Sequence, residues 1–140
     1  MKKNEYLAFI FAHFALFVVF VWFGALKLFD LSPANPLVNA LFDDTLGIML
    51  PISAETFIVL FGGFEVLIGI LFIIPRAEKV AISLLIIHMI TTIMPLFLVP
   101  EMSWQAPFVP TLEGQYIIKN IVIIALVASI FADLKKHRVS

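Results

Sequence analysis

The chain has 140 residues, of which 62% are hydrophobic before glycine is counted and 14% are charged, and its formal net charge is −1. Soluble domains have about 45–50% apolar and about 25% charged residues, so this composition excludes a soluble globular domain, a disordered chain and a nucleic-acid-binding protein. The sequence has no cysteine, which excludes disulfides, thiolate metal sites and thiol redox centres within it. The composition indicates a small polytopic protein whose main partner is the lipid bilayer.

Four stretches are long and apolar enough to cross the membrane, because a transmembrane helix needs about 20 predominantly apolar residues. They cover residues 6–29, 55–74, 80–99 and 115–131, and the last is the shortest. No water is available inside the bilayer to bond the backbone, so each stretch must be helical. The sequence therefore predicts an all-α fold, a four-helix transmembrane bundle that forms a single domain over residues 1–140.

Outside these spans, Lys and Arg lie on one side of the predicted bundle. They precede the first span, fill the turn 75–79 and follow the last span. The loops 30–54 and 100–114 contain acidic residues but no Lys or Arg. The positive-inside rule therefore predicts that both termini and the 75–79 turn lie in the cytoplasm.

The long loop 30–54 contains a predicted short helix. Asn35 and Pro36 form a good helix start, with Asn35 as the N-cap and Pro36 at the first helical position. Apolar residues dominate from Leu37 to Leu50, which favours a helix lying in the outer membrane interface over a segment that re-enters the bilayer. Ser53 is predicted to cap the second span.

Glu65 is the deepest ionisable residue of the predicted spans. It follows Glu55 by about 15 Å of helix, which places it close to the membrane midplane. Gly62, Glu65 and Gly69 share one helix face, where the glycines allow a neighbouring helix to approach closely. The carboxyl group is therefore either part of a packing stripe and bonded to a neighbour, or a group that binds a proton or a ligand.

His88 lies at a similar depth on the third span, about 12 Å from its cytoplasmic end. Thr91, Thr92 and Pro95 fall on the same helix face, and Pro95 cannot donate to the carbonyl of Thr91, which predicts a kink. A kinked, threonine-lined helix opposite Glu65 would line a small polar cavity. The alternative is a neutral histidine that is satisfied by one hydrogen bond between helices.

Two lysines near the outer ends of the spans have two possible orientations each. Lys27 ends the first span, on the face that carries His13; we expect it to snorkel to the interface, and an orientation towards the bundle interior is the alternative. Lys119, between Tyr116 and Asn120, has the same two options. We expect Lys119 to point inward, towards Glu65 or the acidic residues of the outer loops.

Together these side chains predict a polar pocket that opens outward, with candidate ligand-binding residues Trp22, Lys27, Glu65, His88, Tyr116, Lys119 and Asn120. The two lysines would lie above Glu65 and His88, and Trp22 and Tyr116 would form walls. Such a pocket suits a quinone-like or another small polar head group on an apolar body. The same residues would otherwise form a network that only fixes helix register. No metal site, haem site or covalently bound cofactor is predicted, because no two histidines have i, i+4 spacing and thiolates are absent.

Four short motifs follow one another along the chain: WFGALK at 22–27, PLV at 36–38, EVLIG at 65–69 and EGQYIIKN at 113–120. In this order they resemble the motifs of the DoxX-like superfamily, and most closely its YkgB-type branch, which includes a reactive-chlorine-resistance membrane protein. The segment 29–32 departs from that branch, because it lacks the expected pair of an aromatic and an acidic residue.

The resemblance implies a four-helix protein of the bacterial inner membrane, and relatives are described as membrane subunits or partners of quinone-linked oxidoreductases and oxidative-stress complexes. The matched positions are Trp22, Gly24, Lys27, Glu65, Gly69, Tyr116, Lys119 and Asn120. His88 is not among them and depends on the depth argument alone.

From the pocket and the resemblance together, we expect an accessory membrane subunit of a quinone-linked or oxidative-stress redox system. A quinone is the candidate ligand and a redox protein the candidate partner. Two alternatives stay open. One is a transporter for a small polar or weakly acidic solute, which with four helices would need a homo-oligomer. The other is a membrane scaffold or assembly factor without a ligand.

Overall fold

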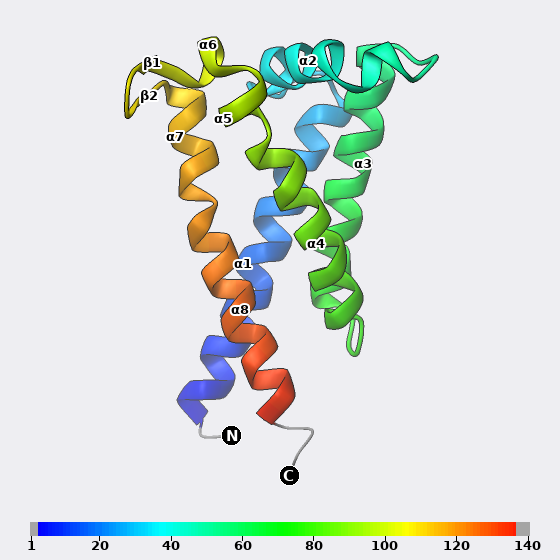
Figure 1. The fold of residues 1–140 in the computed structure, drawn as a ribbon. Helices are drawn as coiled ribbons and strands as arrows, with labels where there is room; N and C mark the ends of the chain where they lie inside the picture. Colours follow the sequence, from blue (N-terminus) through cyan, green and yellow to red (C-terminus); the bar gives the residue numbers. More distant parts are fainter. Residues whose placement is uncertain (1–2, 137–140) are drawn as a thin grey trace.

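A computed structural model describes residues 3–136 as a bundle of long helices that is closed at one end by short elements (Figure 1). The elements in chain order are α1 (Lys3–Leu28), α2 (Asn35–Asp44), the 3₁₀ helix η1 (Leu46–Ile48), α3 (Ala54–Ile73), α4 (Glu78–Ile93), α5 (Pro95–Leu98), α6 (Pro100–Ser103), β1 (Trp104–Ala106), β2 (Val109–Pro110), α7 (Leu112–Lys119) and α8 (Ile121–Lys136).

Four helical segments are long and apolar enough to cross a membrane, which confirms the predicted all-α bundle and gives the chain the architecture of a multi-pass membrane protein. They are Asn4–Leu28, Ala54–Ile73, Glu78–Leu98 and Leu112–Leu134. The fourth is longer than predicted, because the Thr111 hydroxyl accepts a hydrogen bond from the Gly114 N–H at 3.0 Å and starts the helix before the apolar run.

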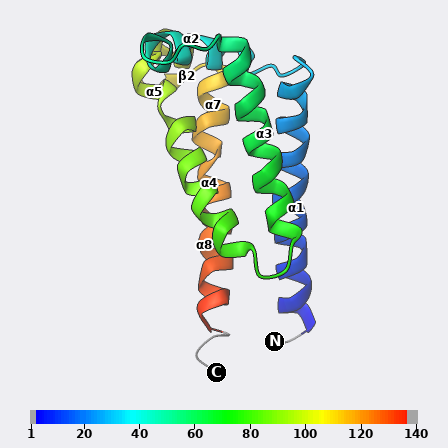
Figure 2. The same cartoon turned by 90° about the vertical axis from the view of Figure 1, so that its right-hand side faces the viewer.

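The connections alternate between the two ends of the bundle (Figures 1 and 2). The start of α1, the turn from α3 to α4 and the end of α8 lie at one end. The helices α2, α5 and α6 and the β1–β2 hairpin lie at the other end, which we call the outer end. The basic residues of the 75–79 turn are therefore far from the acidic outer loops, as the charge pattern predicts.

The helices α1 and α3 pack against each other through glycines. A Cβ atom added to Gly62 would lie 2.7 Å from the carbonyl oxygen of Gly24 and 2.7 Å from Cβ of Lys27. One added to Gly69 would lie 2.8 Å from the side chain of Val21. Any larger residue would push the two helices apart, so the glycine face predicted around Glu65 is confirmed as a surface of close helix contact.

The hydrophobic core lies between the long helices, with Leu16, Ile68, Phe72 and Leu85 almost fully buried. Many large apolar side chains point away from it, and Phe97, for example, is 75% exposed. A water-soluble protein rarely exposes apolar side chains on this scale, whereas helices in contact with lipid do.

The helix α2 lies across the outer end of the bundle (Figure 1). Asn35 is its first residue and not its N-cap as predicted; the side chain is buried, and its Nδ2 donates to Oδ1 of Asp30 at 2.7 Å. The helix ends at Asp44, before the predicted Leu50, because Asp43 and Asp44 in its last turn oppose the helix dipole.

The structure confirms two further local predictions, a helix cap and a helix break at a proline, and adds a short pair of strands. Ser53 caps α3, since its Oγ accepts from the N–H of Thr56 at 3.2 Å. The third span breaks at its proline: α4 ends at Ile93 and α5 begins at Pro95. The antiparallel strands β1 and β2, which pair Trp104 with Pro110, were not predicted from the sequence.

Candidate functional site

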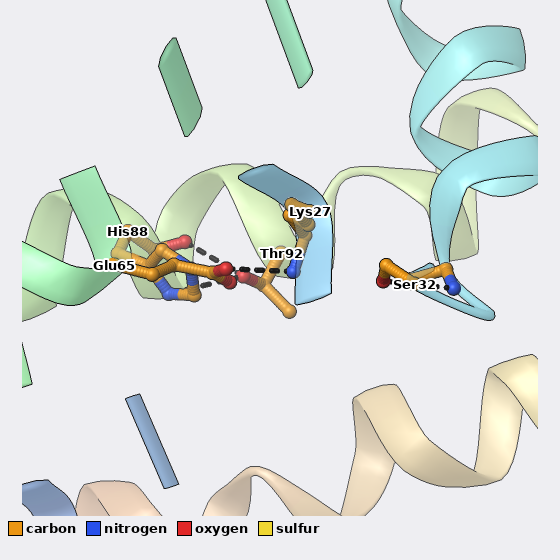
Figure 3. Close-up of polar contacts among 6 residues, drawn as sticks. Lys27, Ser32, Glu65, His88 and Thr92 are labelled. Carbon is orange, nitrogen blue, oxygen red and sulfur yellow. Dashed lines mark hydrogen bonds and ion pairs between the residues drawn. The ribbon is translucent and has the colours of Figure 1, made fainter. Parts of the chain in front are cut away.

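Three ionisable side chains from three helices meet inside the bundle (Figure 3). Lys27 of α1 donates from Nζ to Oε2 of Glu65 on α3 at 2.6 Å, and Nε2 of His88 on α4 lies 2.9 Å from the other carboxyl oxygen, Oε1. The three side chains are only 6–8% exposed. We call these residues the Lys27–Glu65–His88 network; the sequence had left open whether they meet, and the structure brings these three together.

The close packing of α1 and α3 positions the ion pair. Gly24 lies one turn before Lys27 on α1, and a Cβ atom added to it would lie 2.9 Å from Cβ of Glu65. Because glycine removes the side chain at this contact, the short distance between the helices lets Lys27 reach Glu65 directly. Lys27 therefore faces the bundle interior, and the expectation that it snorkels to the interface is wrong.

The imidazole of His88 is held from several sides. Its ring stacks on Phe61, with ring centroids 5.0 Å apart and an interplanar angle of 12°, and it meets the edge of Phe20 at 5.3 Å. Oγ1 of Thr92 lies 3.3 Å from Nδ1 of the ring and 2.9 Å from the carbonyl oxygen of His88. Both ring nitrogens thus have polar neighbours, and the bond to Glu65 is the one that joins two helices, as the simpler interpretation expects.

The network brings a basic and an acidic side chain into direct contact. Burial of such a pair is tolerated when each group has the other as its partner, as Lys27 and Glu65 do. Lysine has three N–H donors, of which the described residues use one, at Glu65. The network can therefore offer N–H groups of Lys27 to an acceptor atom of a ligand.

The other four predicted site residues lie apart from the network. Trp22 and Tyr116 are 65% and 62% exposed and point away from the interior. Lys119 is exposed, and its Nζ lies 5.5 Å from the ring centroid of Tyr116, so the expectation that it points inward is wrong. Asn120 is half-buried and ends α7, where its N–H donates to the carbonyl oxygen of Ile117.

The reversed orientation of Lys119 has a simple cause. Ile117 is the residue of this turn that packs inward, at 6% exposure, and Tyr116 and Lys119 lie three residues apart on the opposite surface. The lysine stays over the aromatic ring near the outer end, where a cation avoids the cost of entering the bundle.

Phe61 is a component of the site that the sequence analysis missed. Its ring stacks on His88 and lies beneath the Lys27 ammonium, whose Nζ is 5.7 Å from the ring centroid. The spacing contains the signal that would have found it, because residues four apart on a helix share one face and Phe61 precedes Glu65 by four.

His13 is a second buried histidine, on α1 and outside the network. Its Nδ1 lies 2.8 Å from the carbonyl oxygen of Phe9, so Nδ1 carries the proton. The other nitrogen, Nε2, is buried and has no hydrogen-bond partner among residues 3–136. The side chain contacts apolar rings, and its ring centroid is 4.1 Å from that of Phe9.

An apolar groove of about 390 Å³ runs between α4 and α8. Its lining includes Ile86, Met89, Ile124 and Phe131 and is almost entirely apolar. It can accommodate a hydrocarbon chain but has no group to orient a polar ligand. Among residues 3–136, no group of three or more His, Asp or Glu side chains could hold a metal ion.

Comparisons of this chain with protein-family models, with curated proteins and with solved structures found no match. The evidence for the site is therefore the geometry of the network, and the DoxX-like resemblance stays a prediction.

Proposed function

We propose that this chain is a DoxX-like accessory subunit of a quinone-linked or oxidative-stress redox system, in which the Lys27–Glu65–His88 network binds the polar head of a quinone-like ligand. The observation that carries this proposal is the convergence of three ionisable side chains in an apolar bundle. Placing a charge at the centre of a span costs about 2.5–3.5 kcal/mol, and such residues usually mark ligand or proton pathways.

The chemistry of the site supports a lipid-soluble ligand with a flat polar head. The Lys27 ammonium can donate to a carbonyl oxygen attached to the quinone ring, and Phe61 offers an aromatic face next to the ammonium. The groove between α4 and α8 is apolar and could hold the hydrocarbon tail of such a ligand, although none of the three network residues lines it. The redox class itself comes from the motifs, which match at Lys27 and Glu65.

We further propose that the protein lies in the bacterial inner membrane with both termini in the cytoplasm and α2 in the outer interface. The basic residues of the 75–79 turn support this orientation. Because the native sequence has no cysteine, a single cysteine introduced by substitution reports the accessibility of its own position without background labelling. In intact spheroplasts, a membrane-impermeant maleimide should label Asp44→Cys, whereas Ala77→Cys should react only after lysis. The opposite labelling pattern would show that the termini lie outside the cytoplasm and would contradict the proposed orientation.

A binding measurement tests the function. Purified protein is titrated with decylubiquinone, and the wild type is compared with Glu65→Gln and with Glu55→Gln, which neutralises an exposed carboxylate on the same helix. We expect wild-type affinity for Glu55→Gln and at least about tenfold weaker binding for Glu65→Gln, equivalent to about 1.4 kcal/mol. Equal affinities of all three proteins, or no binding by the wild type, would overturn the proposal.

A structural role is the second candidate, because both carboxyl oxygens of Glu65 already have partners within the protein. In that case the chain would be a scaffold or assembly factor, and the network would only fix the register of α1, α3 and α4. Glu65→Gln would then lower the stability of the protein, and any phenotype of the host would follow the amount of folded protein. Quinone binding that depends on Glu65 would rule against this alternative.

A further inference from the structure

The apolar groove between α4 and α8 opens to the outside of the bundle. Its floor contains buried side chains, such as Leu85 at 1% and Val127 at 5% exposure. Its rims carry exposed side chains, with Ile86 and Ile90 of α4 at 53% and 61% and Phe131 of α8 at 40%. The groove is therefore a furrow in the surface that contacts lipid, and hydrocarbon is the material that fills it.

The length of the groove matches one leaflet of a bilayer. On α4 the lining extends from Ile82 to Ile93, which is about 16 Å of helix. The hydrocarbon core of a membrane is about 30 Å thick, so the groove covers about half of it, the depth that a single acyl chain spans. A helix of the same length, about 10 Å across, would occupy roughly three times the volume of about 390 Å³. The groove therefore fits an acyl chain and not a helix of a second copy.

One end of the groove reaches the end of the bundle where α4 begins and α8 ends (Figures 1 and 2). Ile82 is the first lining residue of α4, and Phe131 is the last of α8. Lys79 precedes Ile82 by three residues, so it lies on the same face of α4 about one turn beyond the groove, and its side chain is exposed. A head group attached to a chain in the groove would thus meet a cation.

This end of the bundle is basic as a whole. Seven of the nine Lys and Arg residues belong to residues 1–3, 76–79 and 135–138, whereas only three acidic residues, Glu5, Glu78 and Asp133, lie in or beside these segments. The residue before α4 is Ala77, which has no side-chain group to cap the helix, so N–H groups of the first turn can donate to a phosphate. Basic residues next to a membrane span attract anionic lipids, and these charges complement a phosphate.

We infer that the groove is a binding site for an anionic phospholipid of the leaflet at this end, with one acyl chain between α4 and α8 and the phosphate beside Lys79 and the start of α4. The site is separate from the Lys27–Glu65–His88 network, because none of the network residues lines the groove. The inference goes beyond the proposed function and does not depend on it.

Native mass spectrometry of the detergent-purified protein tests the head-group contact. The probes are phosphatidylglycerol and phosphatidylcholine with the same palmitoyl and oleoyl chains. We expect phosphatidylglycerol to bind the wild type at least about fivefold more tightly, and Lys79→Gln to lose about fivefold in affinity for this lipid alone. Lys119→Gln is the matched control, since it removes an exposed lysine near the outer end and should leave both affinities unaltered.

A second pair of variants tests the acyl-chain contact. Ala128 is exposed and lines the groove, so Ala128→Phe fills part of it and should weaken the binding of both lipids at least about tenfold. Ala125→Phe enlarges an exposed residue of the same helix that does not line the groove, and should bind like the wild type.

Equal affinities of the wild type for the two lipids, or unchanged phosphatidylglycerol binding in Lys79→Gln or Ala128→Phe, would overturn this inference. Displacement of the bound lipid by decylubiquinone would assign the groove to a quinone tail and would also overturn it. Failure of decylubiquinone to bind anywhere would overturn the proposed function alone, because the lipid measurements do not involve the network.

Discussion

The ion pair between Lys27 and Glu65 leads to a quantitative prediction about stability. In Lys27→Met the carboxylate stays buried, at 8% exposure, and keeps His88 as its only partner in the network. Removing one member of a buried pair costs about 3–5 kcal/mol, because the remaining charge is left uncompensated. We therefore expect Lys27→Met to lower the free energy of unfolding by about 3 kcal/mol or more.

The double variant Lys27→Met/Glu65→Leu removes both charges. Replacing a buried pair by apolar residues is often nearly neutral, and the remaining loss is one hydrogen bond of His88, about 1 kcal/mol. The double variant should thus be more stable than Lys27→Met alone, with a coupling energy of at least about 2 kcal/mol.

Unfolding in mixed micelles by increasing fractions of SDS, followed by far-ultraviolet circular dichroism, measures these free energies. Glu55→Gln serves as the control, since it neutralises an exposed carboxylate on the same helix and should change stability little. A loss below about 1 kcal/mol in Lys27→Met, or strictly additive effects in the double variant, would refute the reasoning.

Two matched pairs of substitutions test the packing and the histidines. Gly62→Ala places a Cβ atom 2.7 Å from the backbone of α1 and should destabilise by about 1–3 kcal/mol. Gly63→Ala meets nothing within 4 Å and should be neutral or stabilise by up to about 1 kcal/mol in the same SDS titration. His13→Phe removes a buried nitrogen without a partner together with the Nδ1 bond to the Phe9 carbonyl oxygen, and these opposing effects should leave the melting temperature nearly unchanged. His88→Phe removes the bond to Glu65 and should lower the melting temperature. Equal effects of Gly62→Ala and Gly63→Ala would contradict the close helix contact at Gly62. Equal effects of His13→Phe and His88→Phe would contradict the assignment of His88, and not His13, to the network.

The sequence predicted the bundle because the membrane leaves few alternatives. Runs of about 20 apolar residues must be helical in lipid, and basic residues mark one side. The meeting of Glu65 and His88 was predictable for a related reason: two ionisable groups at one depth, on helices joined by a short turn, lower their burial cost by pairing.

The orientations of the two lysines were not predictable from depth. Lys27 and Lys119 both lie near outer ends of spans, where a long side chain can reach either the interior or the interface. Local neighbours decide: Gly24 lets Lys27 approach the helix that carries Glu65, whereas Tyr116 holds Lys119 on the surface.

The outer end was predicted least well. Asn35 resembles an N-cap in sequence, but its side chain is buried at the start of α2 and turns to Asp30, a contact set by tertiary packing. Trp104 of β1 is likewise held by a tertiary contact, since its Nε1 donates to the carbonyl oxygen of Leu96 at 3.0 Å. Neither contact leaves a periodic pattern in the sequence.

Solid-state NMR of the isotope-labelled protein in lipid bilayers tests the convergence of the network most directly. Short-range ¹⁵N–¹³C correlations should connect the Glu65 carboxyl carbon with both Nζ of Lys27 and Nε2 of His88. Both correlations should be absent in Glu65→Leu. A Glu65 carboxyl carbon that shows no contact to either nitrogen, and instead contacts lipid acyl chains, would contradict the structure on which every proposal here depends.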